Sequence, residues 1–125
     1  MPHLTLHYTA NLEGFDPDAA LRAINRALAD SGHFDEAAIK SRALRLDQYR
    51  VGIADAGRGF LHAQLKVLPG RDAETRRHLS RIVLAALETV LPSRHIETQL
   101  CVEVDELDAS TYTKRVIDAQ PPLIP

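Results

Sequence analysis

Hydrophobic and polar residues alternate along several stretches of the chain, most regularly over residues 60–67. Apolar side chains occupy the odd positions from 61 to 67, and a period of two predicts a strand with one buried face. Further on, apolar residues recur every three or four positions up to Pro92, which predicts an amphipathic helix with Asp72 as its N-cap. After a turn around Pro92-Ser93, alternation over residues 100–105 predicts another strand.

The first half of the chain repeats this order. Alternation over residues 3–8 predicts a strand at the start, and Asp16-Pro17 has the N-cap and N1 chemistry of a helix that ends at Gly32. The stripe of this helix that we expect to be buried consists of Leu21, Ile24 and Leu28. A third strand is predicted over residues 39–49. Its expected inward residues are Leu44 and Leu46.

The order strand, helix, strand therefore occurs twice, over about residues 2–49 and 59–106. Parallel pairing within each unit and a connecting loop over residues 52–59 predict an α+β fold, with a four-stranded mixed sheet and two helices on one face. A length of 125 residues with 45% hydrophobic residues suits a single domain over residues 1–125. Residues 107–125, which include Pro121-Pro122 and Pro125, are expected to form a C-terminal arm or a frayed end.

The sheet face away from the helices is unusually polar. It is expected to carry His3, Thr5, His7, His62, Gln64 and Lys66. Two interpretations stay open: a solvated sheet face, as in many small binding modules, or a face that meets other subunits in an oligomer and encloses a polar centre.

Composition narrows the classes of protein. A net charge of −2 lacks the basic excess of a sequence-independent nucleic-acid binder. No apolar run reaches the roughly 18 residues of a membrane span, and the start of the chain has no signal-peptide pattern. The single cysteine, Cys101, excludes an intrachain disulfide and is expected to be a buried or interface thiol. We therefore expect a cytoplasmic protein that binds neither nucleic acid nor membrane.

The motifs of several enzyme classes are missing, including a P-loop, a Gly-rich dinucleotide turn, His-Glu-x-x-His and Cys-x-x-Cys. His3 and His7 lie about 13 Å apart on a strand, so they cannot share a metal ion, and no metal site is expected.

Pro2 remains as a candidate catalytic residue. Removal of Met1 would leave a secondary amine, and burial or nearby cations would lower its pKa and make it a general base. The competing interpretation is that Pro2 is tolerated at a strand start, where no N–H is needed.

Four short motifs carry a resemblance to a known family. They are Pro2-His3-Leu4, Ile39-Lys40-Ser41-Arg42, Gly70-Arg71 and Glu103-Val104-Asp105-Glu106-Leu107. In order and spacing they resemble the 5-carboxymethyl-2-hydroxymuconate isomerase family of the tautomerase superfamily. Residues 63–72 are separately similar to the opening of the single-unit 4-oxalocrotonate tautomerases. The resemblance implies a tautomerase-like fold of two fused β-α-β units, assembled as a homotrimer.

The resemblance also implies roles for individual residues. Pro2 matches the catalytic amino-terminal proline, while Arg42 and Arg71 match substrate-binding arginines. Lys40 stands where the family is expected to have arginine, so the positive charge is kept, but bidentate hydrogen bonding to a carboxylate is lost. Leu61 takes the place of a second proline, so one protomer would supply one catalytic amine. Alternatively, Arg42 could be an exposed ion-pair partner at the start of its strand, and Arg71 could have a structural role.

The implied activity is an isomerase, an intramolecular oxidoreductase that shifts a C=C bond by keto-enol tautomerisation. Its expected substrate is a small anion, 5-carboxymethyl-2-hydroxymuconate from homoprotocatechuate breakdown or a similar unsaturated polycarboxylate. Neither a metal nor an organic cofactor is expected, because the conjugated substrate delocalises the developing charge. The alternatives are a non-catalytic binding module with the tautomerase fold and a ferredoxin-like binding module.

Overall fold

A computed structural model describes residues 1–92 and 96–122 of the protein. Its elements are β1 (His3–Thr9), α1 (Pro17–Asp30), the 3-10 helix η1 (Glu36–Ala38), β2 (Lys40–Leu46), β3 (Arg58–Val67), α2 (Ala73–Thr89) and β4 (Glu97–Glu106). Ser93, in the expected turn after α2, and Pro125 in the arm lie outside the described residues. Within the described ranges, no helix combines the length and the apolar character needed to cross a membrane.

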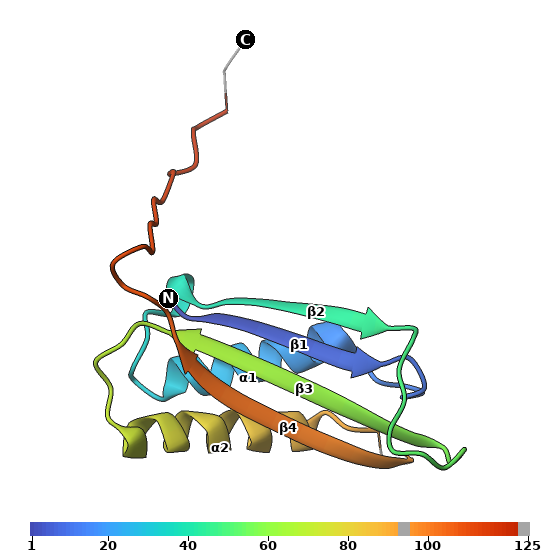
Figure 1. The fold of residues 1–125 in the computed structure, drawn as a ribbon. Coiled ribbons are helices and arrows are strands. Elements are labelled where there is room, and N and C mark those ends of the chain that lie inside the picture. The colour runs from blue at the N-terminus through green and yellow to red at the C-terminus, as the bar shows by residue number, and fades with distance from the viewer. Residues whose placement is uncertain (93–95, 123–125) are drawn as a thin grey trace.

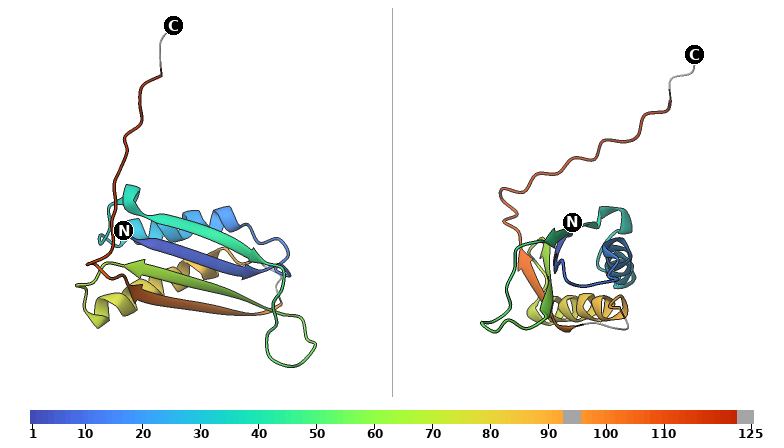
Figure 2. Two further views of the ribbon diagram at one scale, coloured as in Figure 1. Left: turned by 45° about the horizontal axis from the view of Figure 1, so that its top comes forward. Right: turned by 90° about the vertical axis from the view of Figure 1, so that its right-hand side faces the viewer.

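The strands form one mixed sheet in the order β2-β1-β3-β4. β1 pairs in parallel with β2, β3 pairs in parallel with β4, and β1 and β3 pair antiparallel at the centre. Both helices cover the same face of the sheet (Figures 1 and 2). The predicted pair of β-α-β units is thus confirmed. The ferredoxin-like alternative is wrong, since that fold splits its β-α-β units with an intervening strand, and here the two strands of each unit are neighbours.

Both long helices begin at the aspartates that the sequence indicated. The Asp16 carboxylate accepts hydrogen bonds from the backbone N–H groups of Asp18 at 3.0 Å and Ala19 at 3.3 Å, and Pro17 opens α1. The Asp72 carboxylate accepts from Thr75 N–H at 2.8 Å and opens α2. These caps satisfy amide groups that the first turn of a helix leaves without partners.

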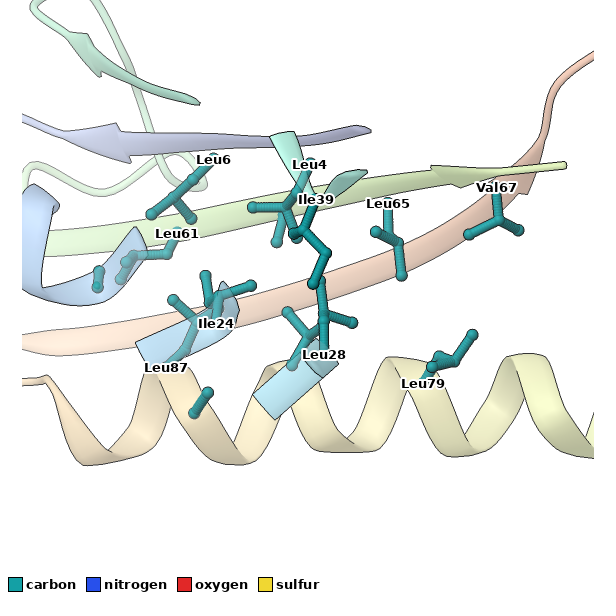
Figure 3. Packing of buried hydrophobic residues seen from close by; sticks show 14 of the residues in the cluster. Leu4, Leu6, Ile24, Leu28, Ile39, Leu61, Leu65, Val67, Leu79 and Leu87 are labelled. Atoms are coloured by element: carbon teal, nitrogen blue, oxygen red, sulfur yellow. The ribbon is translucent and has the colours of Figure 1, made fainter. Parts of the chain in front are cut away.

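The core lies between the sheet and the helices (Figure 3). Its largest members are fully buried: Leu4 and Leu6 from β1, Leu61 and Leu65 from β3, Ile24 and Leu28 from α1, and Leu79 and Leu87 from α2. One predicted core position differs, because Ala20 is fully buried and Leu21 is only half-buried.

For strand β2, the sequence-based prediction is wrong about where the strand ends and which face of the sheet Leu44 occupies. The strand ends at Leu46 rather than near Tyr49, and Leu44 is 47% exposed. The register pairs His7 with Leu44 and Leu6 with Ala43, so Leu44 shares the polar face of the sheet while Ala43 faces the helices. A period of two is equally consistent with either face, and only the pairing with β1 decides between them.

One close approach joins β3 to the turn after β1. A Cβ placed on Gly59 would lie 2.8 Å from Thr9 Oγ1 and 3.0 Å from Asn11 Oδ1. Phe60 N–H also donates to Thr9 Oγ1 at 3.2 Å, so the hydroxyl cannot move away without losing this bond.

We therefore expect Gly59→Ala to destabilise the protein by about 1–3 kcal/mol through overpacking. Gly57→Ala is the matched control, because its Cβ would meet its nearest neighbour, Ile96 Cγ2, at an ordinary 3.9 Å. Urea denaturation of both variants measures the difference in unfolding free energy. Equal stabilities would contradict the overpacking argument.

Candidate active site

The start of β1 lies at one end of the sheet, where several distant segments meet. His3 pairs with Lys40 on β2 and with Lys66 on β3. Because β3 ends at Val67, its carboxyl end lies beside the amino end of β1, and the C-terminal arm begins at the same end (Figure 1). The predicted site residues Pro2 and Lys40 are therefore neighbours, and their contact is direct: Lys40 N–H donates to Pro2 C=O at 3.0 Å.

Pro2 is fully buried. In the described chain it follows Met1, so its nitrogen is part of a peptide bond. The ring precedes the first residue of β1, where a missing N–H leaves no gap in the sheet ladder. The backbone of this residue is therefore held in place both by its own burial and by the bond to β2.

The free amine that precedes Pro2 lies in an unfavourable place for a positive charge. Burial, followed by the charges of Lys40 and Lys114, lowers the pKa of the Met1 amine from 8.0 to about 6. An amine with that pKa is mostly neutral at pH 7, so it carries a free lone pair under ordinary conditions. A neutral amine at this position has the chemistry of a general base.

Arg42 follows Lys40 on the same face of β2 and contacts β1. Its Nη2 lies 3.0 Å from His3 Nδ1, and His3 Nε2 lies 3.0 Å from the hydroxyl of Tyr112. Burial, and then the charges of Lys40 and Arg42, lower the pKa of His3. Because a guanidinium only donates, His3 Nδ1 accepts from Arg42, and in the neutral ring Nε2–H donates to Tyr112.

Within the part of the chain that the structure describes, Lys40 and Arg42 have no acidic partners. Six arginines elsewhere pair with carboxylates at 2.5–3.3 Å, namely Arg22, Arg45, Arg50, Arg58, Arg76 and Arg77. Among residues 1–92 and 96–122, neither Lys40 nor Arg42 forms such an ion pair; the Lys40 ammonium donates to Ala38 C=O instead. The arrangement leaves positive charge available for an anionic ligand.

Arg71 contacts other parts of the chain than Lys40 and Arg42 do. Its Nη2 donates to His33 C=O at 3.1 Å, its Nη1 lies 3.5 Å from Leu68 C=O, and its guanidinium stacks 4.7 Å over the Phe34 ring. The side chain therefore ties the loop between α1 and η1 to the turn between β3 and α2. The structure brings Pro2, Lys40 and Arg42 together and places Arg71 on the adjoining loop.

Two residues at this site were missed by sequence reasoning, Tyr112 and Lys114. Both belong to the segment expected to be an arm or a frayed end. The sequence Asp108-Ala109-Ser110 indicates only that the chain turns here, because an aspartate followed two residues later by serine favours an Asx-type turn. In the structure the Asp108 carboxylate accepts from both Ser110 N–H at 3.0 Å and Ser110 Oγ at 2.6 Å.

The middle of the polar sheet face carries a second group of titratable side chains. The rings of His7 and His62 stack with centroids 6.5 Å apart, and His62 lies 3.4 Å from Glu103. Cys101 pairs with His62 in the register and is exposed in the single chain, so a buried thiol is wrong. In the part of the chain that the structure describes, no three His, Cys, Asp or Glu residues are grouped as metal ligands would be.

The comparisons with known proteins agree with one another. A model of the 5-carboxymethyl-2-hydroxymuconate isomerase family matches residues 2–119. Among solved structures, a 5-carboxymethyl-2-hydroxymuconate isomerase from Deinococcus radiodurans R1 is 28% identical, with a TM-score of 0.79 over 91% of this chain and 88% of that one. No curated protein matches the chain.

Two further structures are similar in fold. A 5-carboxymethyl-2-hydroxymuconate delta-isomerase is 23% identical, with a TM-score of 0.70 over 93% of this chain and 88% of that one. A structure described as a fused 4-OT wild type symmetric trimer is 13% identical, with a TM-score of 0.69 over 90% of this chain and 93% of that one. At these identities the likeness concerns the fold.

The charge of Lys40 is expected to contribute, after burial, to the low pKa of the terminal amine. Replacing Lys40 with alanine removes a positive charge that disfavours the ammonium form, so the pKa of the amine should rise from about 6 toward 8.0. Lys40→Arg keeps the charge and should keep the pKa low. An NMR titration of the amine measures both, and an unchanged pKa in Lys40→Ala would refute this electrostatic role.

Proposed function

Because the chain belongs to the 5-carboxymethyl-2-hydroxymuconate isomerase family, we propose that it isomerises 5-carboxymethyl-2-hydroxymuconate, or a similar unsaturated hydroxy polycarboxylate from homoprotocatechuate breakdown. The family makes it an isomerase that shifts a carbon–carbon double bond. The observation that carries the proposal is the low pKa of the Met1 amine at the start of the chain, close to Lys40 and Arg42, which have no acidic partner among the described residues.

The proposed base is the nitrogen of Pro2 after removal of Met1. The same burial and the same cations would then act on a secondary amine at the start of β1. The neutral nitrogen takes the proton from the 2-hydroxyl, so an O–H bond breaks and an N–H bond forms. The ammonium then returns the proton to a carbon further along the conjugated chain, so N–H breaks, C–H forms and the double bond moves. No net proton or electron is consumed.

The cations would bind the carboxylates of the substrate and stabilise the charge that develops on its oxygen. Arg42 offers a planar fork for bidentate binding, and Lys40 offers a point charge. Arg71 is proposed as the third cation; two of its five N–H donors face backbone carbonyls, which leaves others for a carboxylate. Three cations suit a substrate with three carboxylates, and the reaction needs no metal or organic cofactor because the substrate delocalises its own charge.

We further propose that the protein works as a homotrimer. The polar sheet face carries the exposed Leu44 together with the stacked His7 and His62, a mixture that suits contact with other subunits. The fold is similar to that of the fused 4-OT described as a symmetric trimer. A native mass of three chains in solution would be expected, and a site could then draw its cations from adjacent subunits.

The first test concerns the amine. An extra residue ahead of Pro2 converts its nitrogen to an amide and should lower kcat by about 10²–10⁴-fold, the range supplied by general acid–base catalysis. Pro2→Ala keeps a terminal amine and should keep part of the activity. Intact mass defines the first residue, and an ultraviolet isomerisation assay measures turnover. Full activity of the extended protein with unchanged trimer mass would reject the amine mechanism and favour a different role for this fold.

The second test concerns the carboxylate-binding cations. Arg42→Ala should raise KM about tenfold, since a hydrogen bond between charged groups is lost. Arg45→Ala is the matched control on the same strand: Arg45 pairs with Tyr8 in the register, faces the other side of the sheet, and binds Asp47 at 3.0 Å. Steady-state kinetics compare the two, and an equal KM in both variants would remove Arg42 from the substrate site.

A further inference from the structure

The C-terminal arm does not leave the body of the protein directly after β4. Leu107 N–H donates to Val67 C=O at 2.8 Å, so the first residue of the arm is attached to the end of β3. A turn follows, in which Thr111 N–H at 3.2 Å and Tyr112 N–H at 3.1 Å both donate to Asp108 C=O. This turn brings Tyr112 to His3 at the start of β1, and the exposed residues that follow lead away from the body of the protein (Figures 1 and 2).

Tyr112 fixes the arm to the site. Its hydroxyl lies 3.0 Å from His3 Nε2, and the two rings meet edge to face with centroids 6.0 Å apart. The opposite ring nitrogen, His3 Nδ1, accepts from Arg42 at 3.0 Å. One imidazole thus connects Tyr112 of the arm to Arg42 of β2.

Lys114 stands two residues beyond Tyr112, within about 7 Å of it on an extended chain. Its charge acts both on the Met1 amine and on His3. The side chain belongs to an exposed residue, and among residues 1–92 and 96–122 it forms no ion pair with a carboxylate. One acidic residue of the arm, Asp108, has its carboxylate bound by Ser110. Lys114 therefore adds a further unneutralised cation to those from β2.

We propose that residues 107–114 complete the active site: Lys114 binds a carboxylate of the anionic substrate, and Tyr112 is a positioning residue that holds His3 and, through it, Arg42. This inference rests on the proposed function, since it assigns further residues to the same site. The proposed role of the arm differs from a purely structural role in what it affects. A structural arm would affect stability, whereas this arm determines substrate affinity and the protonation of the amine.

The test compares Lys114→Ala with the adjacent Arg115→Ala in the processed protein, with 5-carboxymethyl-2-hydroxymuconate as the probe. Arg115 is the matched control, because Lys40 and Lys114 are the described residues whose charges act on the Met1 amine, and Arg115 is not among them. Lys114→Ala should raise KM about tenfold with a smaller change in kcat. Lys114→Arg should restore KM, and Arg115→Ala should match the parent protein.

The pH profile gives a second measurement on the same variants. The charged groups that act on the amine are Lys40 from β2 and Lys114 from the arm, and the charge of the amine acts in turn on His3 of β1, which Arg42 contacts. Loss of Lys114 removes a cation that opposes protonation, so the amine stays protonated to higher pH. The rising limb of kcat/KM should therefore move to higher pH in Lys114→Ala and stay in place in Arg115→Ala.

Tyr112→Phe tests the positioning role, with Tyr49→Phe in the loop after β2 as its control. The phenylalanine keeps the ring contact with His3 but removes the hydroxyl, so the NMR signal of the His3 Nε2 proton should broaden through faster exchange with water. KM should rise about threefold because Arg42 is less well held. The same His3 signal and the same KM in Tyr112→Phe and in the parent protein would overturn this role.

Failure of the inference is distinguishable from failure of the proposed function. If the processed parent protein shows no turnover, the proposed function is wrong, and an NMR titration of the terminal amine in Lys114→Ala still decides whether the arm acts at the site. If the parent protein turns over substrate and Lys114→Ala matches it in KM and pH profile, the function stands and the arm is not part of the site.

Discussion

The pairing of β1 with strands on both sides is the constraint on which the site depends. Because β1 lies between β2 and β3 and begins at His3, the residues that precede it are held close to one end of the sheet. The bond from Lys40 N–H to Pro2 C=O extends this pairing to the residue before the strand. A terminal amine is usually among the most mobile groups of a protein, and here the sheet gives it a defined position.

That position would have little chemical effect without the charges around it. Six arginines in the described chain pair with carboxylates, whereas Lys40 and Lys114 near the amine and Arg42 beside His3 form no such pair among the described residues. Uncompensated positive charge lowers local stability and disfavours the ammonium form. The same charge attracts an anionic ligand, so substrate binding and activation of the base have one physical cause. This combination is typical of functional sites, where perturbed pKa values are concentrated.

The parts of the structure that sequence reasoning predicted are those set by local chemistry. Asp16 and Asp72 cap their helices because a side chain and the amides it binds lie within three residues of each other. Leu4, Leu6, Leu61 and Leu65 are buried as their period-two spacing indicates. Leu44 follows the same period but faces the opposite side, because its face is decided by the register with His7 and not by its neighbours in the chain.

By itself the sequence determined the two β-α-β units, the helix starts, most of the core and the candidates Pro2, Lys40 and Arg42, since each depends on a short window or on motifs held at regular spacing. Only the tertiary structure decided that Arg71 ties two loops together through His33 and Phe34. It alone also brought Tyr112 to His3, across a separation of 109 residues. Contacts between residues so far apart in the sequence depend on how the strands pair and where β4 ends, and no local pattern of residues encodes them.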